Sequence, residues 1–344
     1  MPRVSGTPAS ATEARIAWSD DLGDYVTAVG WAADGALVAA SSLSGRAVVL
    51  GADGALVAEL PEHPMGALAL DWSPRAQRVA FAGQDGVLRI WEPGPAPAVA
   101  WEQPAWISTV AWAPNGTRLA AGAGRTLGVF EPDGTPVREY PDLPSTVADL
   151  AWSGDSRRVG AAVYGGPLWF EPARTADDAA AHFAWTGSLL TLTVAPSGKW
   201  CASGNQDRSV HVWRLWSGDD LQMSGYPTKI SALAWSPSSR FLAVGSFDDV
   251  TLWDFAGRGP RGTTPRALTG FEGAATGLAY STDGTHLAAT TDDGLRVWAV
   301  ERGGGTPAVA VEIGEPLSTL AWRPGCPELL VGSAAGRIIR VCLS

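Results

Sequence analysis

The sequence has few cysteines, few basic residues and no long hydrophobic run. Its three Cys form no C-x-x-C pair, which excludes a disulfide framework and a thiolate zinc site and indicates a reducing compartment. Lys and Arg number 25 against 35 Asp and Glu, and the net charge of −10 disfavours nucleic acid and anionic membranes as partners. No apolar stretch approaches the ~20 residues of a membrane-spanning helix, and the opening MPRVSGTPASATEA lacks the apolar core of a secretory signal. We therefore expect a cytoplasmic protein.

Helical periodicity is also lacking, whereas turn-forming residues are abundant. The 41 Gly and 25 Pro favour many short elements joined by tight turns. With 46% hydrophobic residues the chain can still bury a large core. These features predict an all-β protein. The use of 23 Arg against two Lys, with much Ala and Gly, is typical of a high-GC bacterial genome.

One short pattern recurs eight times along the chain. In each copy an aliphatic residue lies two positions before a large anchor residue, and a turn follows. The anchors are spaced by 40 to 45 residues and are Trp31, Trp72, Trp112, Trp152, Val194, Trp235, Tyr280 and Trp322. Beyond most anchors a second apolar stretch ends in an aromatic residue, namely Trp91, Phe130, Trp169, Trp213, Trp253 or Trp298. Each unit predicts a four-stranded sheet, and radial stacking of such sheets would cover their apolar faces.

Three third-strand motifs resemble the WD-repeat β-propeller family. They are QDGVLRIW (84–91), NQDRSVHVW (205–213) and DDGLRVW (292–298), in which a turn Asp precedes a Trp by six residues. The resemblance implies structural roles for Asp85, Trp91, Asp207, Trp213, Asp292 and Trp298. In the family, an upstream His joins this Asp and Trp and a Ser or Thr in a hydrogen-bonded tetrad. Only His63 occupies the His position, so most blades are expected to rely on apolar packing.

The eight anchors predict eight blades, with seven blades plus an atypical unit as the alternative. The last unit ends with its third strand, and an unassigned strand, ARIAWSD (14–20), precedes the first anchor. We expect this strand to complete the last blade and close the ring. The predicted organisation is a flexible tail over residues 1–13 and a single propeller over 14–344.

The function predicted from the sequence is that of a non-catalytic scaffold. The resemblance implies a ligand-binding rim where the first strands begin, and aromatic and Arg residues there would supply binding hot spots. The predicted partner-binding residues are Tyr25, Trp106, Arg125, Arg208, Lys229 and Phe247. We expect a protein or peptide partner and a monomeric protein. The segment 214–229 is either a recognition loop or the fourth strand of its blade.

The alternative is an enzyme, or a small-molecule or metal binder, that uses the mouth of the central channel. No hydrolase, metalloprotease or P-loop motif is present, and the residues nearest the axis are expected to be small and aliphatic. The motif Gly257-x-Gly259-x-x-Gly262 contains Pro260 and leads into no predicted helix, so we interpret it as a loop. Cys201 and His211 are predicted on one hairpin without a third ligand. We therefore expect no catalytic residue, metal or cofactor.

Overall fold

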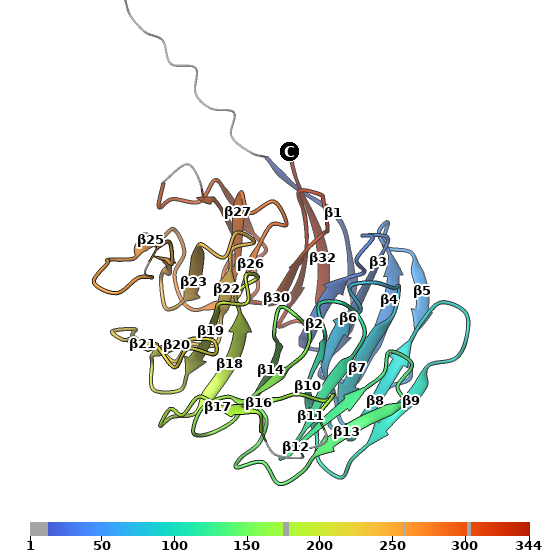
Figure 1. Cartoon of the computed structure of the whole chain (residues 1–344). Coiled ribbons are helices and arrows are strands. Elements are labelled where there is room, and N and C mark those ends of the chain that lie inside the picture. The colour runs from blue at the N-terminus through green and yellow to red at the C-terminus, as the bar shows by residue number, and fades with distance from the viewer. Residues whose placement is uncertain (1–12, 175–178, 258, 301–303) are drawn as a thin grey trace, which may run out of the picture.

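In the computed structural model, the described residues form thirty-two strands, grouped into eight four-stranded antiparallel sheets (Figure 1). The structure describes residues 13–174, 179–257, 259–300 and 304–344, and these form no α-helix. The prediction of an eight-bladed all-β propeller is confirmed, and the seven-bladed alternative is wrong. Residues 1–12 of the predicted tail lie outside the described part of the chain.

In seven of the eight blades the strands follow chain order from the ring axis outward, whereas the outer strand of the last blade is the N-terminal strand. The first strands are β2 (Val26–Trp31), β6 (Ala67–Trp72), β10 (Ile107–Trp112), β14 (Asp149–Trp152), β18 (Leu189–Val194), β22 (Leu233–Trp235), β26 (Ala275–Tyr280) and β30 (Leu317–Trp322). The second strands are β3 (Leu37–Ser42), β7 (Val79–Gly83), β11 (Leu119–Ala123), β15 (Val159–Ala162), β19 (Trp200–Asn205), β23 (Phe241–Gly245), β27 (His286–Thr291) and β31 (Glu328–Ser333).

The third and outer strands complete the blades. The third strands are β4 (Ala47–Gly51), β8 (Val87–Trp91), β12 (Thr126–Phe130), β16 (Leu168–Phe170), β20 (Val210–Arg214), β24 (Val250–Asp254), β28 (Gly294–Ala299) and β32 (Arg337–Leu343). The outer strands are β5 (Leu56–Glu59), β9 (Ala98–Glu102), β13 (Pro136–Tyr140), β17 (Ala181–His182), β21 (Asp220–Met223), β25 (Arg266–Leu268), β29 (Val309–Glu312) and β1 (Ala14–Asp21). Blades are numbered 1 to 8 from β2 to β30. The segment 214–229 thus contains the outer strand of blade 5.

The first strands form the wall of the central channel. Each contacts the first strand of the next blade, and β30 contacts β2, so the contacts run round the whole ring. The second strands are buried on both faces, as in Val79–Gly83, where every residue is buried. Small and β-branched side chains suit this position because both faces of the sheet pack against neighbouring blades.

Anchor tryptophans join consecutive blades by a repeated hydrogen bond. The indole Nε1 of Trp112 donates to the carbonyl of Asp71 at 3.1 Å, and that of Trp152 donates to Ala111 at 3.0 Å. Trp72 and Trp322 make the same bond. The acceptor always belongs to the residue before the preceding blade's anchor. The indole of Trp235 is equally buried but has no hydrogen-bond partner among the described residues.

The N-terminal strand closes the ring, as predicted. β1 pairs antiparallel with β32 from Ala14 opposite Leu343 to Asp21 opposite Arg337. Figure 1 shows this pair, blue beside red, next to the C-terminus. Trp18 on β1 also donates from its indole to the carbonyl of Ala52 in blade 1 at 2.9 Å. The closing strand therefore connects the last blade with the first.

The anchors give a prediction for stability. We expect Trp112→Ala to lower the free energy of unfolding by about 3–5 kcal/mol, because it removes a buried indole between two blades. The matched pair Trp112→Phe and Trp235→Phe isolates the hydrogen bond, and the former should cost about 1 kcal/mol more. Urea unfolding followed by circular dichroism measures both. Equal losses for the two Phe variants would show that the indole–carbonyl bond adds nothing to stability.

Closure of the ring gives a second prediction. Deletion of residues 1–20 removes the partner of β32 and exposes its edge, so the protein should aggregate or melt at a lower temperature. Deletion of residues 1–12 leaves every β1–β32 pair in place and serves as the control. Light scattering and thermal melts compare the two truncations. A monomeric 1–20 deletion with an unchanged melt would contradict the closing role of β1.

Candidate functional site

The loops that lead into the first strands and the hairpins that join second to third strands lie at one end of the ring. We call this end the entry rim. Backbone contacts join the two kinds of loop: Leu43 N donates to Tyr25 O at 2.8 Å and Gly124 N to Trp106 O at 3.2 Å. The antiparallel order of each blade places them together, because a first strand begins where the second ends.

All six predicted partner-binding residues lie in loops of the entry rim. Tyr25, Trp106 and Lys229 precede first strands, whereas Arg125, Arg208 and Phe247 lie in hairpins between second and third strands. The structure distributes them around the ring rather than in one patch. Arg208, Lys229 and Phe247 belong to neighbouring loops of blades 5 and 6, while Tyr25 and Trp106 belong to blades 1 and 3.

The large apolar side chains of this rim are exposed. The exposed fraction is 54% for Trp106 and 46% for Phe247. Three further exposed residues lie on the same rim, namely Leu43, Met65 and Tyr164. Tyr164 lies in the hairpin of blade 4 that is equivalent to those of Arg125 and Phe247, whereas sequence reasoning missed Leu43 and Met65. Among the described residues, the opposite end of the ring exposes one large apolar side chain, Trp216. Of the eleven large apolar side chains exposed among the described residues, six lie on the entry rim, four lie on outer strands and one lies at the opposite end.

The three predicted cations differ in how they are held. Arg125 donates from Nε to the carbonyl of Leu143 at 2.6 Å, so part of its guanidinium is committed to the backbone. Arg208 and Lys229 are exposed, and no carboxylate of the described residues lies within ion-pair distance of either. Arg208 also adopts a left-handed backbone conformation with φ of 64°. Both free cations are thus available to a partner.

His63 contacts the turn aspartate of blade 2 directly. Its Nδ1 lies 2.7 Å from Asp85 Oδ1 and 3.0 Å from Nη1 of Arg89, which also binds Asp85. Burial lowers the pKa of His63, so its neutral form is favoured at neutral pH. Trp91 packs edge-on against the anchor Trp72. Arg89 completes this cluster, which the family pattern alone did not indicate.

Asp207 belongs to a chain of polar contacts in blade 5. It accepts a hydrogen bond from Ser209 at 2.6 Å, and Ser209 accepts one from Asn205 at 3.1 Å. Trp213 lies apart from this chain and packs against His211, with ring centroids 4.5 Å apart. Asp207 and Trp213 therefore contact different residues.

Aromatic residues replace the family histidine in the neighbouring blades. In blade 6 the indole of Trp253 donates to the hydroxyl of Tyr226 at 2.9 Å. In blade 7 Phe271 packs edge-on against Trp298. The contact of Phe271 agrees with the expected reliance on apolar packing, whereas Tyr226 retains a hydrogen bond.

The turn aspartate of blade 7 requires a correction. The spacing indicated Asp292, but Asp293 contacts Thr291 and forms an ion pair with Arg296. Asp292 instead accepts a hydrogen bond from the backbone of Ala274 at 3.2 Å. The third strand of this blade begins at Gly294, directly after Asp292 and Asp293. The aspartate that contacts the residues of the turn is therefore Asp293, one position later than the spacing indicated.

The channel wall is more polar than the sequence predicted. Asp71 accepts a hydrogen bond from Trp112 N at 2.7 Å, and Asp149 accepts one from Leu192 N at 2.8 Å. Each carboxyl thus bridges to the first strand of the next blade. Burial raises the pKa of Asp149 and raises that of Asp71 to about 7. The expectation of only small and aliphatic residues near the axis is wrong at these positions.

The remaining candidates from the sequence are the pair of Cys201 and His211 and the glycine-rich motif. Cys201 is buried opposite Trp213, and His211 pairs with Ser203 and binds Asp220 at 2.7 Å. Within the described part of the chain, no three His, Cys, Asp or Glu side chains are grouped to hold a metal. The Gly257 to Gly262 segment joins β24 to β25 and leads into a strand, as its interpretation as a loop requires.

A family model described as the WD domain, G-beta repeat, matches residues 54–92, 180–214, 221–254 and 262–299. Each match covers the outer strand of one blade and the first three strands of the next. Four such repeats on an eight-bladed ring decide the family. The chain is a WD-repeat β-propeller.

A curated relative of this WD-repeat propeller is the small ribosomal subunit protein RACK1 of Drosophila melanogaster. The two are 32% identical over 126 residues, which is 35% of this chain and 39% of RACK1. The propeller therefore matches well under half of that relative. Within the described residues, no helix is long and apolar enough to cross a membrane.

The buried carboxyl of Asp71 gives a prediction for pH. Its pKa of about 7 exceeds the ordinary 3.8, so the folded protein binds the proton more tightly than the unfolded chain. Its contribution to the free energy of unfolding should therefore fall as the pH rises from about 4 to about 7. Asp71→Asn keeps an acceptor for Trp112 N and cannot ionise. Between pH 4 and pH 7, the free energy of unfolding of this variant should rise by on the order of 3 kcal/mol relative to that of wild type, as measured by urea unfolding. A constant difference would contradict the raised pKa.

Proposed function

We propose that this WD-repeat propeller is a non-catalytic scaffold that holds a protein or peptide partner on its entry rim. The observation that carries the proposal is the placement of exposed apolar side chains. Of the large apolar residues exposed in the described chain, six lie on this rim: Tyr25, Leu43, Met65, Trp106, Tyr164 and Phe247. Large aromatic and aliphatic side chains concentrated on one face are typical of interaction surfaces.

The rim also offers a polar margin around these apolar groups. Arg208 and Lys229 are free cations in rim loops of blades 5 and 6, and Phe247 lies in another loop of blade 6. Asp24 and Asp248 are exposed acids next to Tyr25 and Phe247 in the sequence. Interfaces of this kind bury an apolar centre and leave charges at the edge. A protein surface with an apolar centre and mixed charges is therefore the partner chemistry we propose.

The comparisons support a binding role in an assembly. RACK1, by its name, is a protein of the small ribosomal subunit, and it shares part of this chain's repeat sequence. With a net charge of −10, the propeller is proposed to bind protein rather than nucleic acid or membrane. We further propose a monomer in the cytoplasm of a bacterial cell, where its three cysteines remain reduced. All three are free in the structure.

The double variant Trp106→Ala/Phe247→Ala tests the rim. Because both side chains are exposed, its melt should stay within about 1 kcal/mol of wild type. Its recovery of a partner, measured by affinity purification with quantitative mass spectrometry, should fall by about 30-fold, the equivalent of 2 kcal/mol.

The matched control for this test is Trp216→Ala, which removes the exposed aromatic of the opposite end. It should retain the partner that the rim variant loses. Normal recovery by the rim variant, or equal loss by the control, would contradict a binding site on the entry rim.

A further inference from the structure

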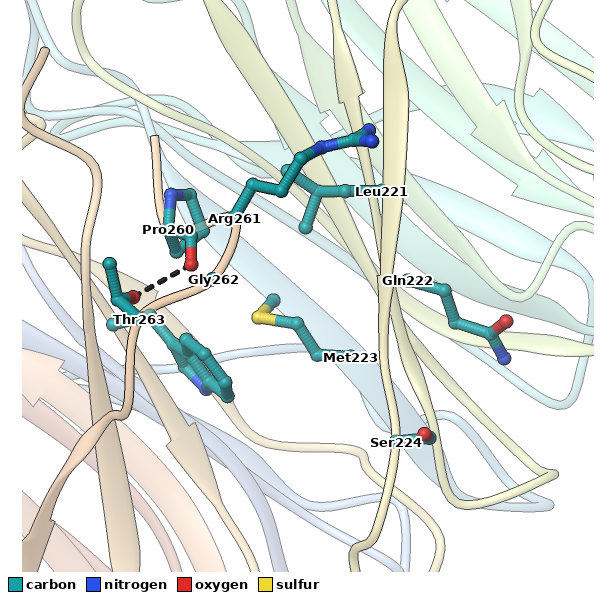
Figure 2. A pocket seen from close by; sticks show the side chains of 9 residues that line it. Leu221, Gln222, Met223, Ser224, Pro260, Arg261, Gly262 and Thr263 are labelled. Atoms are coloured by element: carbon teal, nitrogen blue, oxygen red, sulfur yellow. Dashed lines mark hydrogen bonds between the residues drawn. The ribbon is translucent and has the colours of Figure 1, made fainter. Parts of the chain in front are cut away.

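A groove separates blades 5 and 6 on the side of the ring. It lies between the outer strand β21 of blade 5 and the loop that follows β24 of blade 6 (Figure 2). Two adjoining cavities, of about 430 and 980 Å³, share Leu221 and Arg261 and form one continuous depression. We call it the blade 5–6 groove. None of the residues predicted for partner binding lines it.

The smaller cavity is apolar and preformed. Leu221 and Met223 alternate with Gln222 along β21, and in Figure 2 Met223 points toward the loop of Pro260 and Thr263 while Gln222 points away. Trp253 forms another part of the wall. A volume of this size accepts one or two aliphatic or aromatic side chains of a ligand.

Internal hydrogen bonds fix the walls of this cavity. The indole of Trp253 is held by Tyr226. Across the groove, Thr263 donates from its hydroxyl to the carbonyl of Pro260 at 2.7 Å, which stabilises the loop turn. Arg261 reaches over to β21 and donates to the carbonyl of Asp220 at 3.2 Å. The cavity therefore needs little rearrangement to receive a side chain.

The larger cavity is polar and carries free positive charge. Lys199 and Arg261 line it, and no carboxylate of the described residues lies within 4.0 Å of either cation. Of the two acids of this cavity, Asp219 pairs with Arg214 at 3.5 Å. Asp220 binds His211 at 2.7 Å, but burial lowers the pKa of His211, so this hydrogen bond does not cancel the charge of Asp220. The cations Lys199, Arg214 and Arg261 outnumber the two acids by one. Arg261 uses one of its five N–H donors in a described bond. In a protein of net charge −10, this is a local site for carboxylates.

We propose that the blade 5–6 groove binds an extended acidic peptide of a partner protein. One aliphatic or aromatic side chain of the peptide enters the cavity between Met223 and Trp253. Neighbouring Asp or Glu side chains bind Arg261 and Lys199 in the polar cavity. The apolar cavity favours such a peptide over a nucleic acid, which has no aliphatic side chain to enter it. The net charge of −10 also repels a polyanion more strongly than it repels a short peptide with two carboxylates. This site is separate from the entry rim and does not depend on the function proposed there.

The chain supplies its own reporters for the two surfaces. It contains three methionines, of which Met223 lines the groove and Met65 is exposed on the entry rim. In protein labelled with ¹³C at the methionine methyl groups, each surface therefore gives a separate signal. The Met→Leu variants at these two positions assign the signals.

The probe is the peptide GSDELFSG, titrated into the labelled protein. Two matched peptides, GSKKLFSG and GSDEGSSG, reverse its charge and remove its apolar side chains. We expect the first peptide to shift the Met223 signal and leave Met65 unchanged, and the other two to bind at least about tenfold more weakly. A single-stranded oligonucleotide is the fourth titrant and should leave Met223 unchanged.

Two variants test the residues, and a third is the control. Arg261→Glu and Lys199→Glu should each weaken binding of GSDELFSG by about tenfold or more, because each replaces a cation with a repelling acid. Arg75→Glu changes an exposed arginine in the turn after β6 that also has no described ion pair, and it should alter binding less than about twofold. All three side chains are exposed, so the melts should match wild type.

Several results would overturn the proposal. These are no shift of Met223 at about 2 mM peptide, equal binding of the charge-reversed peptide, or an effect of Arg261→Glu no larger than that of Arg75→Glu. Displacement of the peptide by the oligonucleotide, with its own shift of Met223, would assign the groove to a polyanion instead. A shift of Met65 alone would place the peptide on the entry rim and leave the function proposed there intact.

Discussion

Contact between neighbouring blades is the interaction on which the whole structure depends. A four-stranded sheet has two apolar faces, and each is covered only when another sheet lies against it. The anchor indoles of Trp112 and Trp152 add a directed hydrogen bond to this packing, because each reaches a carbonyl of the preceding blade. Since every blade needs two neighbours, the ring must close. The pairing of β1 with β32 meets that requirement by joining the two ends of the chain.

The loop that joins the outer strand of one blade to the first strand of the next carries a ring in blades 2, 6 and 7, but the contacts of this ring differ. In blade 2, His63 and Asp85 share a hydrogen bond, and Arg89 beside them forms an ion pair with Asp85. In blade 6, the hydroxyl of Tyr226 takes the place of the imidazole and accepts from Trp253. In blade 7, Phe271 retains only the aromatic contact. In blades 6 and 7 the ring at this position contacts the third-strand aromatic, whereas the ring of His63 packs edge-on against Phe81 of the second strand. The polar partner can vary because the packing around the ring supplies most of the stability.

The rigid ring presents two surfaces of different character. The entry rim combines exposed aromatics such as Trp106 with mixed charges, and it is built from loops that the first strands position. The blade 5–6 groove has a recessed apolar cavity next to Lys199 and Arg261, and the long loop of blade 6 forms one of its walls. Because the two surfaces use different loops and different charges, partners could occupy both at once without competing. That arrangement suits a scaffold, whose role is to hold separate partners at fixed positions.

The sequence by itself determined the fold, since the spacing of anchors such as Trp112 and the unassigned strand 14–20 follow from a repeat that each blade must obey locally. It also placed the predicted rim residues in the correct loops, because strand alternation fixes which end each loop occupies. Only the tertiary structure decided that Asp293 takes the turn role and that Asp149 bridges two first strands. It alone revealed the groove beside Arg261. The physical reason is that these features join residues of different hairpins or blades, and their separation depends on turn length and on how adjacent sheets pack, which no local pattern encodes.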